Sequence, residues 1–360
     1  MELYDLLAKQ NPDRLKADTF QYGRPIIQLF ADTLPAGAPA SGITKAAVVA
    51  WFDQLANYPK KAGDMIAFRG LNFREVIARN AALPEPKPPI SRRTANKYLA
   101  SLGGFCAWLI KRGMLDANPT AGLGYKDEEA TQRRPYTLPE LTAIFGSPLY
   151  TGFKADRREH LPGELRTRDW RFWLPLLGLY TGARLGELAQ LLTADVRCEE
   201  GAWLLYVTAE GDDAKSLKTA GSRRVVPVHA ELIRLGLIDH HAALVAAGEA
   251  RLWPEIKPDT RGHFSGVPSR WWGKYVDRIG MADPTIVFHS FRHGLADELR
   301  RVGYADAEIG FILGHADDKT STTRGYGILS HGNLARRVEM MSRVVFPGLD
   351  LSHLRSVPNG

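Results

Sequence analysis

The sequence predicts a mainly α-helical protein with one small β-sheet, in which a helical domain precedes a mixed α+β domain. Its 360 residues exceed the usual size of a single domain. Apolar residues recur at helical spacing from Ile43 to Leu123, without strand-like alternation. Two β-rich runs, Trp203–Thr208 and Arg224–Val228, predict a β-hairpin whose long tip extends from Glu210 to Ser222.

The first domain is expected to span residues 43–125, after an N-terminal leader, residues 1–42, whose order the sequence does not settle. Its most regular helix follows Ser91, a typical N-cap residue, and should end near Asn118-Pro119. The apolar side chains of this helix recur every three or four residues and predict one buried face: Tyr98, Leu99, Leu102, Phe105, Cys106, Leu109 and Ile110.

A polar, charged stretch without apolar periodicity, residues 126–135, predicts an interdomain linker. The second domain then covers residues 136–346, and residues 347–360 form a C-terminal tail. Within the second domain, Asp169–Tyr180 is typical of a largely buried helix, and the turn Thr181-Gly182-Ala183 leads into another helix.

The overall charge favours a polyanionic partner without identifying one. The chain carries 47 Lys and Arg against 40 Asp and Glu, a net charge of +7. Cys106 and Cys198 lie far apart and show no metal-ligand spacing, which indicates a reducing compartment. No apolar run reaches the roughly 20 residues that cross a bilayer, and no signal-peptide pattern is present, so we expect a cytoplasmic protein without a membrane partner.

Several polar residues at the edges of apolar segments are candidates for chemistry. Arg184 follows a glycine turn and opens a helix, and a buried arginine there needs a partner, which Glu187 can provide. A purely structural ion pair gives the same pattern. Lys218 lies in the hairpin tip, where a lysine either contacts a ligand or is merely solvated.

The segment His289-Ser290-Phe291-Arg292-His293 places an imidazole and a guanidinium three residues apart, on one face of a helix. Arginine offers a fixed fork of donors to a phosphate, and histidine can carry a proton near neutral pH. A zinc site on His289 and His293 is disfavoured, because no third ligand with suitable spacing stands out. We therefore expect no metal at this segment.

Two further candidates follow along the chain. His315 comes directly after Ile312-Leu313-Gly314 at the end of a helix, where an imidazole more often caps or packs. Tyr326 lies between two glycines in the polar run Ser321–Gly327, which suits projection into a site better than core packing. Its phenol, with a pKa of about 10, needs nearby cations and a proton acceptor before it can act as a nucleophile.

These candidates occur in the order of the active-site residues of tyrosine recombinases, also called phage integrases: Arg184, Lys218, His289, Arg292, His315 and Tyr326. Around them, the segments Thr-Gly-Ala-Arg-Leu-Gly-Glu, His-Ser-Phe-Arg-His and Leu-Gly-His resemble the motifs of that family. The resemblance covers about Pro135 to Phe346, and the helical domain before it resembles the family's core-binding domain in position and character. The interval from His315 to Tyr326 is slightly longer than the commonest family arrangement, so the loop of the nucleophile is expected to differ in shape.

The resemblance implies a phosphate clamp. Arg184 and Arg292 would bind the non-bridging oxygens of a scissile phosphate, and His315 would add a hydrogen bond. Glu187 fits a supporting role behind the arginines. Donors aimed at the equatorial oxygens of the transition state are each worth on the order of 100-fold to 1000-fold in rate.

The resemblance also implies that Tyr326 attacks phosphorus while Lys218 donates a proton to the departing 5′ oxygen. His289 would assist proton transfer at the nucleophile or bind the phosphate. A 3′-phosphotyrosine stores the broken bond until a 5′ hydroxyl attacks it, so we expect no metal or nucleotide cofactor. The expected activity is that of a site-specific recombinase or integrase of a mobile genetic element.

The expected partner is double-stranded DNA, which both domains contact. Cations outside the catalytic set are its expected contacts, although a solvated polar face gives the same pattern: Arg92, Arg93, Lys97 and Arg223. In the family, a homo-tetramer joins two DNA sites and its protomers exchange a C-terminal element. The candidate here is His331–Val345, for which an ordinary core helix is the favoured interpretation; its apolar face contains Leu334, Val338, Met341 and Val345. Whether accessory DNA-bending proteins take part stays open.

Three other functions stay open at this point. A type IB topoisomerase shares the tyrosine chemistry but relaxes one duplex as a monomer. A DNA-binding regulator keeps the fold without catalysis. A metal-dependent hydrolase built on His289 and His293 is the third, and it would be sensitive to chelators.

Overall fold

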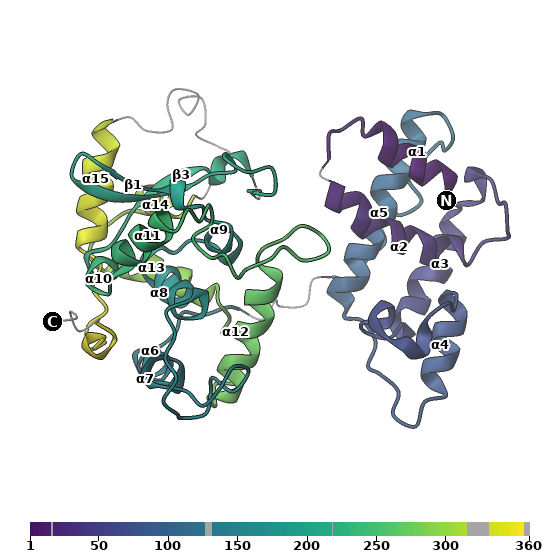
Figure 1. Cartoon of the computed structure of the whole chain (residues 1–360). Helices are drawn as coiled ribbons and strands as arrows, with labels where there is room; N and C mark the ends of the chain where they lie inside the picture. Colours follow the sequence, from purple (N-terminus) through teal and green to yellow (C-terminus); the bar gives the residue numbers. More distant parts are fainter. Residues whose placement is uncertain (16, 127–131, 218, 315–330, 356–360) are drawn as a thin grey trace. The chain divides into compact units, whose positions relative to one another are not determined.

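The computed structural model divides into two compact units, Met1–Ala130 and Thr131–Gly360 (Figure 1). It describes residues 1–15, 17–126, 132–217, 219–314 and 331–355. The predictions made for Lys218, His315 and Tyr326 therefore lie outside the described residues.

The first unit is helical throughout its described part. Its α-helices are α1 (Glu2–Gln10), α2 (Ala17–Ala31), α3 (Lys45–Gln54), α4 (Phe73–Ala81) and α5 (Arg92–Lys111). Helix α5 begins as predicted, because the Ser91 hydroxyl accepts a hydrogen bond from the Thr94 backbone N–H at 3.2 Å. The prediction that it extends to Asn118-Pro119 is wrong: it ends at Lys111, and Gly113 with φ of +67° turns the chain away.

Residues 1–42, for which the sequence predicted only a leader of unsettled order, contain two helices that belong to the core of the first unit. Helices α1 and α2 pack against each other and against α5. Tyr4 lies edge-on to Phe105 of α5, with ring centroids 5.4 Å apart. Phe30 of α2 meets Trp51 of α3 in the same way at 5.5 Å. Helices α1 and α2 thus contribute side chains to the same apolar core as α3 and α5.

The second unit combines α-helices with one small sheet. Its α-helices are α6 (Leu138–Phe145), α7 (Pro148–Thr151), α8 (Trp170–Thr181), α9 (Leu185–Ala189), α10 (Ala230–Arg234), α11 (Leu237–Ala246), α12 (Gly266–Arg278), α13 (Ser290–Arg301), α14 (Asp306–Leu313) and α15 (His331–Ser342). Its strands are β1 (Val196–Glu199), β2 (Ala202–Val207) and β3 (Arg224–Pro227). This arrangement confirms the predicted fold class, mainly helical with a small sheet.

Helix α8 forms the centre of the second unit. Every residue from Phe172 to Thr181 is buried, and α8 packs against α13, α9, α10 and α7. The Asp169 side chain caps its first turn, accepting a hydrogen bond from the Arg171 backbone N–H at 2.8 Å. Because α8 and α13 lie side by side, the turn after α8 comes close to residues of the first turn of α13.

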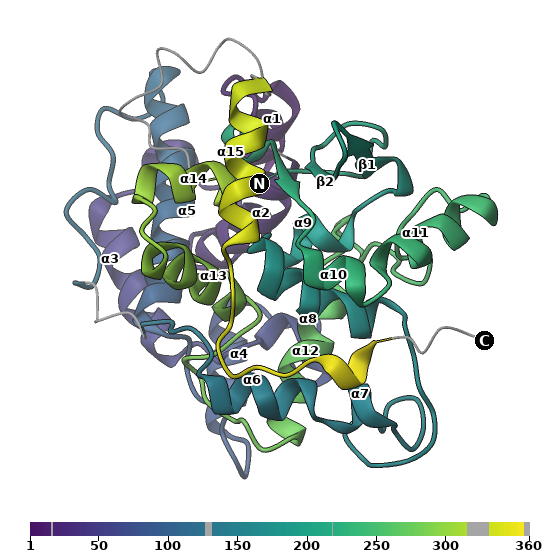
Figure 2. The ribbon, with the colours of Figure 1, turned by 90° about the vertical axis from the view of Figure 1, so that its left-hand side faces the viewer.

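The sheet is antiparallel in the order β1-β2-β3. Strands β2 and β3 pair with Val207 opposite Arg224, which confirms the predicted hairpin. Strand β1 was not predicted, because it is a short edge strand whose sequence, Val-Arg-Cys-Glu, is mostly polar. Helices α14 and α15 both pack against β3. The two helices are labelled in Figure 2. All four residues of β3 are buried.

The C-terminal part of the chain packs on the second unit. In α15, Leu334 and Met341 are buried, so the described part of this helix serves as a core helix of its own chain, the interpretation favoured from the sequence. Val345 was predicted on the same face but lies beyond the helix and is exposed. The predicted tail is partly ordered, since Leu351 and Leu354 are buried in the core. No helix in the described ranges is long and apolar enough to span a membrane.

We expect Phe30→Ala to destabilise the first unit by about 3 to 5 kcal/mol, the usual cost of truncating a buried aromatic side chain. Phe30 is 2% exposed, whereas Tyr22 on the same helix is 42% exposed and provides the matched control Tyr22→Ala. Thermal unfolding of the two variants measures the difference. Equal melting temperatures would mean that the helices before Ile43 are not part of the folded core.

Candidate active site

Arg184 is placed by a glycine turn between α8 and α9. Helix α8 ends at Thr181, and Gly182 follows with φ of +59°, a conformation that side chains with a Cβ rarely adopt. A Cβ at Gly182 would also lie 2.5 Å from Leu313 Cδ2 and 2.9 Å from Leu295 Cδ2. Glycine therefore lets this turn pack closely against α13 and α14, and Arg184 then begins α9.

Glu187 is the carboxylate around which the site is organised. It is 5% exposed. One oxygen accepts a hydrogen bond from Arg184 Nη1 at 2.8 Å, and the other accepts from the Arg184 backbone N–H and from Arg224 Nη2, each at 2.8 Å. Burial by itself opposes ionisation of Glu187, but the charges and hydrogen bonds of Arg224 and Arg184 outweigh burial and hold its pKa below the ordinary value.

Arg292, in the first turn of α13, lies near Glu187 and its two arginine partners. Its guanidinium is almost fully buried and donates to two main-chain carbonyls, Gly182 O at 2.8 Å and Leu313 O at 2.5 Å. Burial, together with the charges of Arg224 and Arg184, lowers the pKa of Arg292 to about 9. The Arg292 guanidinium stays cationic at neutral pH. None of its described hydrogen-bond partners is a carboxylate.

Positive charge exceeds negative charge at this place. Within the described part of the chain, the guanidiniums of Arg184, Arg224 and Arg292 interact with the single carboxylate of Glu187. Buried charges are costly unless they are paired. An anion with several oxygens, such as a phosphate diester, would supply the missing negative charge and accept the forked donors of arginine.

His289 immediately precedes α13 and is exposed, unlike the buried Arg292. The His289 and His293 rings meet edge to face, with centroids 5.1 Å apart. Among the described residues, no three His, Cys, Asp or Glu side chains gather as a metal site would require. The two histidines therefore gain no third ligand from that part of the chain.

The loop between β2 and β3 is held by contacts before and after Lys218, and those after it reach Arg184. Before Lys218, the buried Lys215 Nζ contacts both oxygens of Asp195 at 2.9 and 2.7 Å. After it, the Thr219 hydroxyl lies 3.0 Å from Ser222 Oγ, to which Arg184 Nη1 donates at 3.4 Å. Lys215 is thus engaged in an ion pair, whereas Lys218 lies outside the described residues.

The expected DNA contacts are surface residues. Arg93 and Lys97 are exposed on α5, and Arg92 is exposed with its guanidinium 5.4 Å from the ring centre of Tyr125. Arg223 is 40% exposed and pairs with Glu210 at 2.8 Å.

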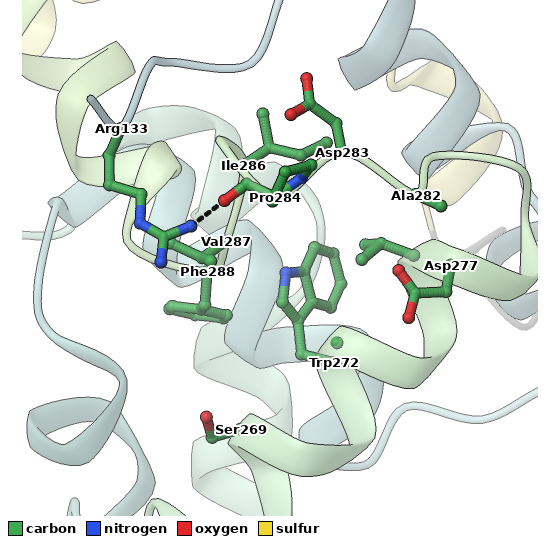
Figure 3. A pocket seen from close by; sticks show the side chains of 12 residues that line it. Arg133, Ser269, Trp272, Asp277, Ala282, Asp283, Pro284, Ile286, Val287 and Phe288 are labelled. Carbon is green, nitrogen blue, oxygen red and sulfur yellow. Dashed lines mark hydrogen bonds between the residues drawn. The ribbon is translucent and has the colours of Figure 1, made fainter. Parts of the chain in front are cut away.

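A cavity of about 660 Å³ lies between α12 and the segment that leads into α13 (Figure 3). Its walls are largely apolar, with Trp272, Ile286 and Phe288 among them, and Arg133 donates a hydrogen bond to the Pro284 carbonyl at its edge. None of the predicted catalytic residues lines this cavity. We assign it no catalytic role.

The structure therefore brings Arg184, Glu187 and Arg292 together, with His289 at the start of the same helix as Arg292. Sequence reasoning missed Arg224, which was read only as the first residue of a β-run, and favoured its exposed neighbour Arg223. One signal was available: a charged residue that heads a strand made otherwise of Val and Pro needs a buried partner.

Comparison with known proteins gives consistent matches. A model of the phage integrase family matches residues 165–328. The tyrosine recombinase XerC of Neisseria gonorrhoeae is 26% identical over 246 residues, which cover 68% of this chain and 71% of the relative. The XerC of Xylella fastidiosa is 26% identical over 282 residues, covering 76% of this chain and 80% of the relative.

Solved structures share the fold. A lambda integrase dimer bound to a COC′ core site gives a TM-score of 0.55 at 17% identity, covering 91% of this chain and 98% of that one. A lambda integrase tetramer bound to a Holliday junction gives 0.55 at 17% identity, covering 89% and 75%. The Tn1549 transposon integrase in complex with transposon right end DNA gives 0.53 at 17% identity, covering 94% and 98%.

We expect Glu187→Gln to destabilise the second unit by about 3 kcal/mol at neutral pH, because removing one member of a buried ion pair leaves the other charges uncompensated. The folded pKa of Glu187 is lowered, so its ionised form stabilises the fold above the unfolded pKa, and this contribution is lost as the pH falls through the folded value. Urea unfolding at several pH values should show the difference from wild type shrinking in acid.

The control for this prediction is Glu339→Gln, which removes a carboxylate 43% exposed and paired with Arg336 at 2.8 Å. We expect that change to alter the free energy of unfolding by less than about 1 kcal/mol. If Glu187→Gln proved as mild as Glu339→Gln, the carboxylate would not be the centre of the arginine cluster.

Proposed function

Because this chain belongs to the tyrosine recombinase family, also called the phage integrase family, we propose that it is a site-specific DNA recombinase or integrase of a mobile genetic element. It cleaves and rejoins DNA strands through a covalent 3′-phosphotyrosine formed on Tyr326. The observation that carries this proposal is the excess of buried guanidinium groups over carboxylates around Glu187.

The arginine cluster fits a phosphate in charge and in donor geometry. Arg184 and Arg292 bind the two non-bridging oxygens of the scissile phosphate, and His315 adds a hydrogen bond. Both guanidiniums are held by main-chain or carboxylate oxygens at 2.5 to 2.8 Å, so they are oriented before the substrate arrives. Such preorganised donors stabilise the charge that develops on equatorial oxygens in the transition state.

In the cleavage step, the Tyr326 oxygen forms a bond to phosphorus and the bond from phosphorus to the 5′ oxygen breaks. The phenol loses its proton to a neighbouring acceptor, for which His289 is our candidate. The leaving 5′ oxygen receives a proton from Lys218. The products are a 3′-phosphotyrosine and a free 5′ hydroxyl.

In the joining step, a 5′ hydroxyl from the partner duplex attacks the phosphotyrosine and releases Tyr326. One phosphate ester replaces another at each step, so the reaction needs no external energy source. Cations of side chains supply the charge stabilisation that a metal ion provides in other phosphoryl-transfer enzymes. We therefore propose activity without a metal or nucleotide cofactor.

Double-stranded DNA is the partner in this proposal, and the first unit serves as the core-binding domain. We propose that the cations of α5, which are exposed, contact phosphates and that Arg223 is a further contact. By analogy with the lambda integrase tetramer, four copies act on two DNA sites. The two cysteines, Cys106 and Cys198, are unpaired, which supports a reducing, cytoplasmic setting.

We expect wild-type protein to form a covalent adduct with DNA in the presence of a chelator, and Tyr326→Phe to bind DNA without forming it. The substitution removes only the nucleophilic oxygen. Fragmented DNA from a candidate host is incubated with each protein and resolved on a denaturing gel. Tyr304→Phe is the control, because the Tyr304 hydroxyl is buried and has no hydrogen-bond partner among the described residues.

An adduct that persists in Tyr326→Phe would overturn the assignment of the nucleophile. A second experiment uses DNA that the wild-type protein binds and that carries a nick to trap the intermediate. If the wild-type protein forms no adduct on this DNA, it is a non-catalytic regulator. Adducts that form only on one duplex, with relaxation but no strand exchange, would indicate a topoisomerase.

We expect Lys218→Ala to slow cleavage of ordinary DNA much more than cleavage of DNA whose 5′ bridging oxygen is replaced by sulfur. Sulfur leaves without a proton, so the general acid becomes dispensable. Single-turnover rates on the two substrates measure the difference. Equal losses on both would remove Lys218 from the role of general acid.

A further inference from the structure

We propose that Arg224 is a positioning residue of this active site, which aligns the phosphate clamp for cleavage. It fixes Arg184 through Glu187. It also fixes the end of α14, which His315 follows in the sequence. This inference rests on the proposed function and adds a residue to it. Arg224 is not a catalytic residue in this account, because it acts through its neighbours.

The first link runs from Arg224 through Glu187 to Arg184. Arg224 Nη2 donates to Glu187 Oε2 at 2.8 Å, and Glu187 Oε1 accepts from Arg184 Nη1 at the same distance. Arg224 and Glu187 are 3% and 5% exposed, whereas the Arg184 side chain is 27% exposed. The buried pair therefore forms a fixed base, and the more accessible arginine in front of it is the one placed to meet a phosphate.

The second link runs from Arg224 to the end of α14. Its Nε donates to the Ile312 carbonyl at 2.7 Å, which is one of the last carbonyls of the helix. Gly314 then ends the helix with φ of +67°. A Cβ at Gly314 would lie 3.0 Å from both Cδ and Nη1 of Arg224, so the glycine makes room for the arginine. In sequence, His315 comes next.

The third link reaches the β2–β3 loop. Arg224 Nη1 donates to the Ser222 carbonyl at 2.9 Å, and the Ser222 hydroxyl accepts the longer hydrogen bond from Arg184. One guanidinium thus joins strand β3, the end of α14 and the start of α9. Arginine suits this task, because its planar fork can donate in three directions at once, whereas lysine is a single point charge.

Stability alone does not explain an arginine here. Replacing buried ion pairs by well-packed apolar residues is often neutral or stabilising. Moreover, after burial, the charge of Arg224 is the largest contribution that lowers the pKa of Arg292, so Arg224 makes the cluster less favourable when no anion is bound. The benefit of Arg224 therefore lies in the geometry that it gives the donors around a bound phosphate.

The test compares single-turnover cleavage rates at saturating DNA, using a fragment recovered from the covalent adduct of wild-type protein. Arg224→Met keeps the volume but removes the donors, and Arg224→Lys keeps the charge. We expect roughly 10-fold to 100-fold slower cleavage by Arg224→Met, the scale of loss from slight misplacement of reacting groups, with DNA affinity near that of wild type. Arg224→Lys should recover part of the rate.

The matched control is Arg168→Met. Arg168 also donates to two main-chain carbonyls in the second unit, Leu235 O at 2.6 Å and Leu354 O at 2.5 Å, and none of its hydrogen bonds involves the cluster. Its loss should lower the melting temperature and leave the cleavage rate of bound DNA unchanged. Melting curves for all variants identify any that is unfolded at the assay temperature, and Arg224→Lys then replaces Arg224→Met as the deciding variant.

Two further readouts separate positioning from a general structural effect. On DNA with a 5′ bridging sulfur, the rate loss in the Arg224 variants should persist, because the phosphate clamp rather than the leaving-group proton is disturbed. In the double variant Arg224→Met with Glu187→Gln, the loss should hardly exceed that of the more damaging single change, because both act through one chain of contacts.

Wild-type cleavage rates in folded Arg224→Met and Arg224→Lys would overturn this inference while leaving the proposed function intact. Recovery of full activity on the sulfur-containing DNA, or fully additive losses in the double variant, would overturn it as well. If wild-type protein itself formed no adduct, the proposed function would fail first, and the two failures are thereby distinguished.

Discussion

The site depends on one buried carboxylate set among arginines. Glu187 accepts hydrogen bonds from two guanidiniums and one main-chain N–H, and its charge is what allows Arg184 and Arg224 to stand so close to Arg292. The single carboxylate of Glu187 does not neutralise the three guanidiniums. Positive charge is left over at the point where α9, α13, α14 and β3 meet, and an oxyanion with a phosphate's geometry can offset it.

The backbone supports this cluster at two glycines. Gly182 and Gly314 both adopt positive φ and end α8 and α14, and at each of them a Cβ would meet a neighbouring side chain within 3.0 Å. The carbonyls around these turns then serve as acceptors, Gly182 O and Leu313 O for Arg292 and Ile312 O for Arg224. The guanidiniums of the site thus donate to carbonyls at the ends of α8 and α14.

The sequence predicted what depends on local spacing. The Arg184 and Glu187 candidates lie three residues apart, and the helix and hairpin periods gave the fold class. It did not predict Arg224, because the partners Glu187 and Ile312 are distant in sequence and only the fold brings them together. The helices within residues 1–42 and the packing of Leu351 and Leu354 were missed for the same reason, since burial of a short apolar segment is decided by tertiary contacts.

The most direct test of the account is to digest the wild-type covalent adduct with trypsin and nuclease and to locate the linked nucleotide by mass spectrometry. Cleavage after Arg324 and Arg336 gives the peptide Gly-Tyr-Gly-Ile-Leu-Ser-His-Gly-Asn-Leu-Ala-Arg, whose one tyrosine is Tyr326. We predict a nucleotide 3′-phosphate on that tyrosine. A nucleotide on any other peptide would contradict it.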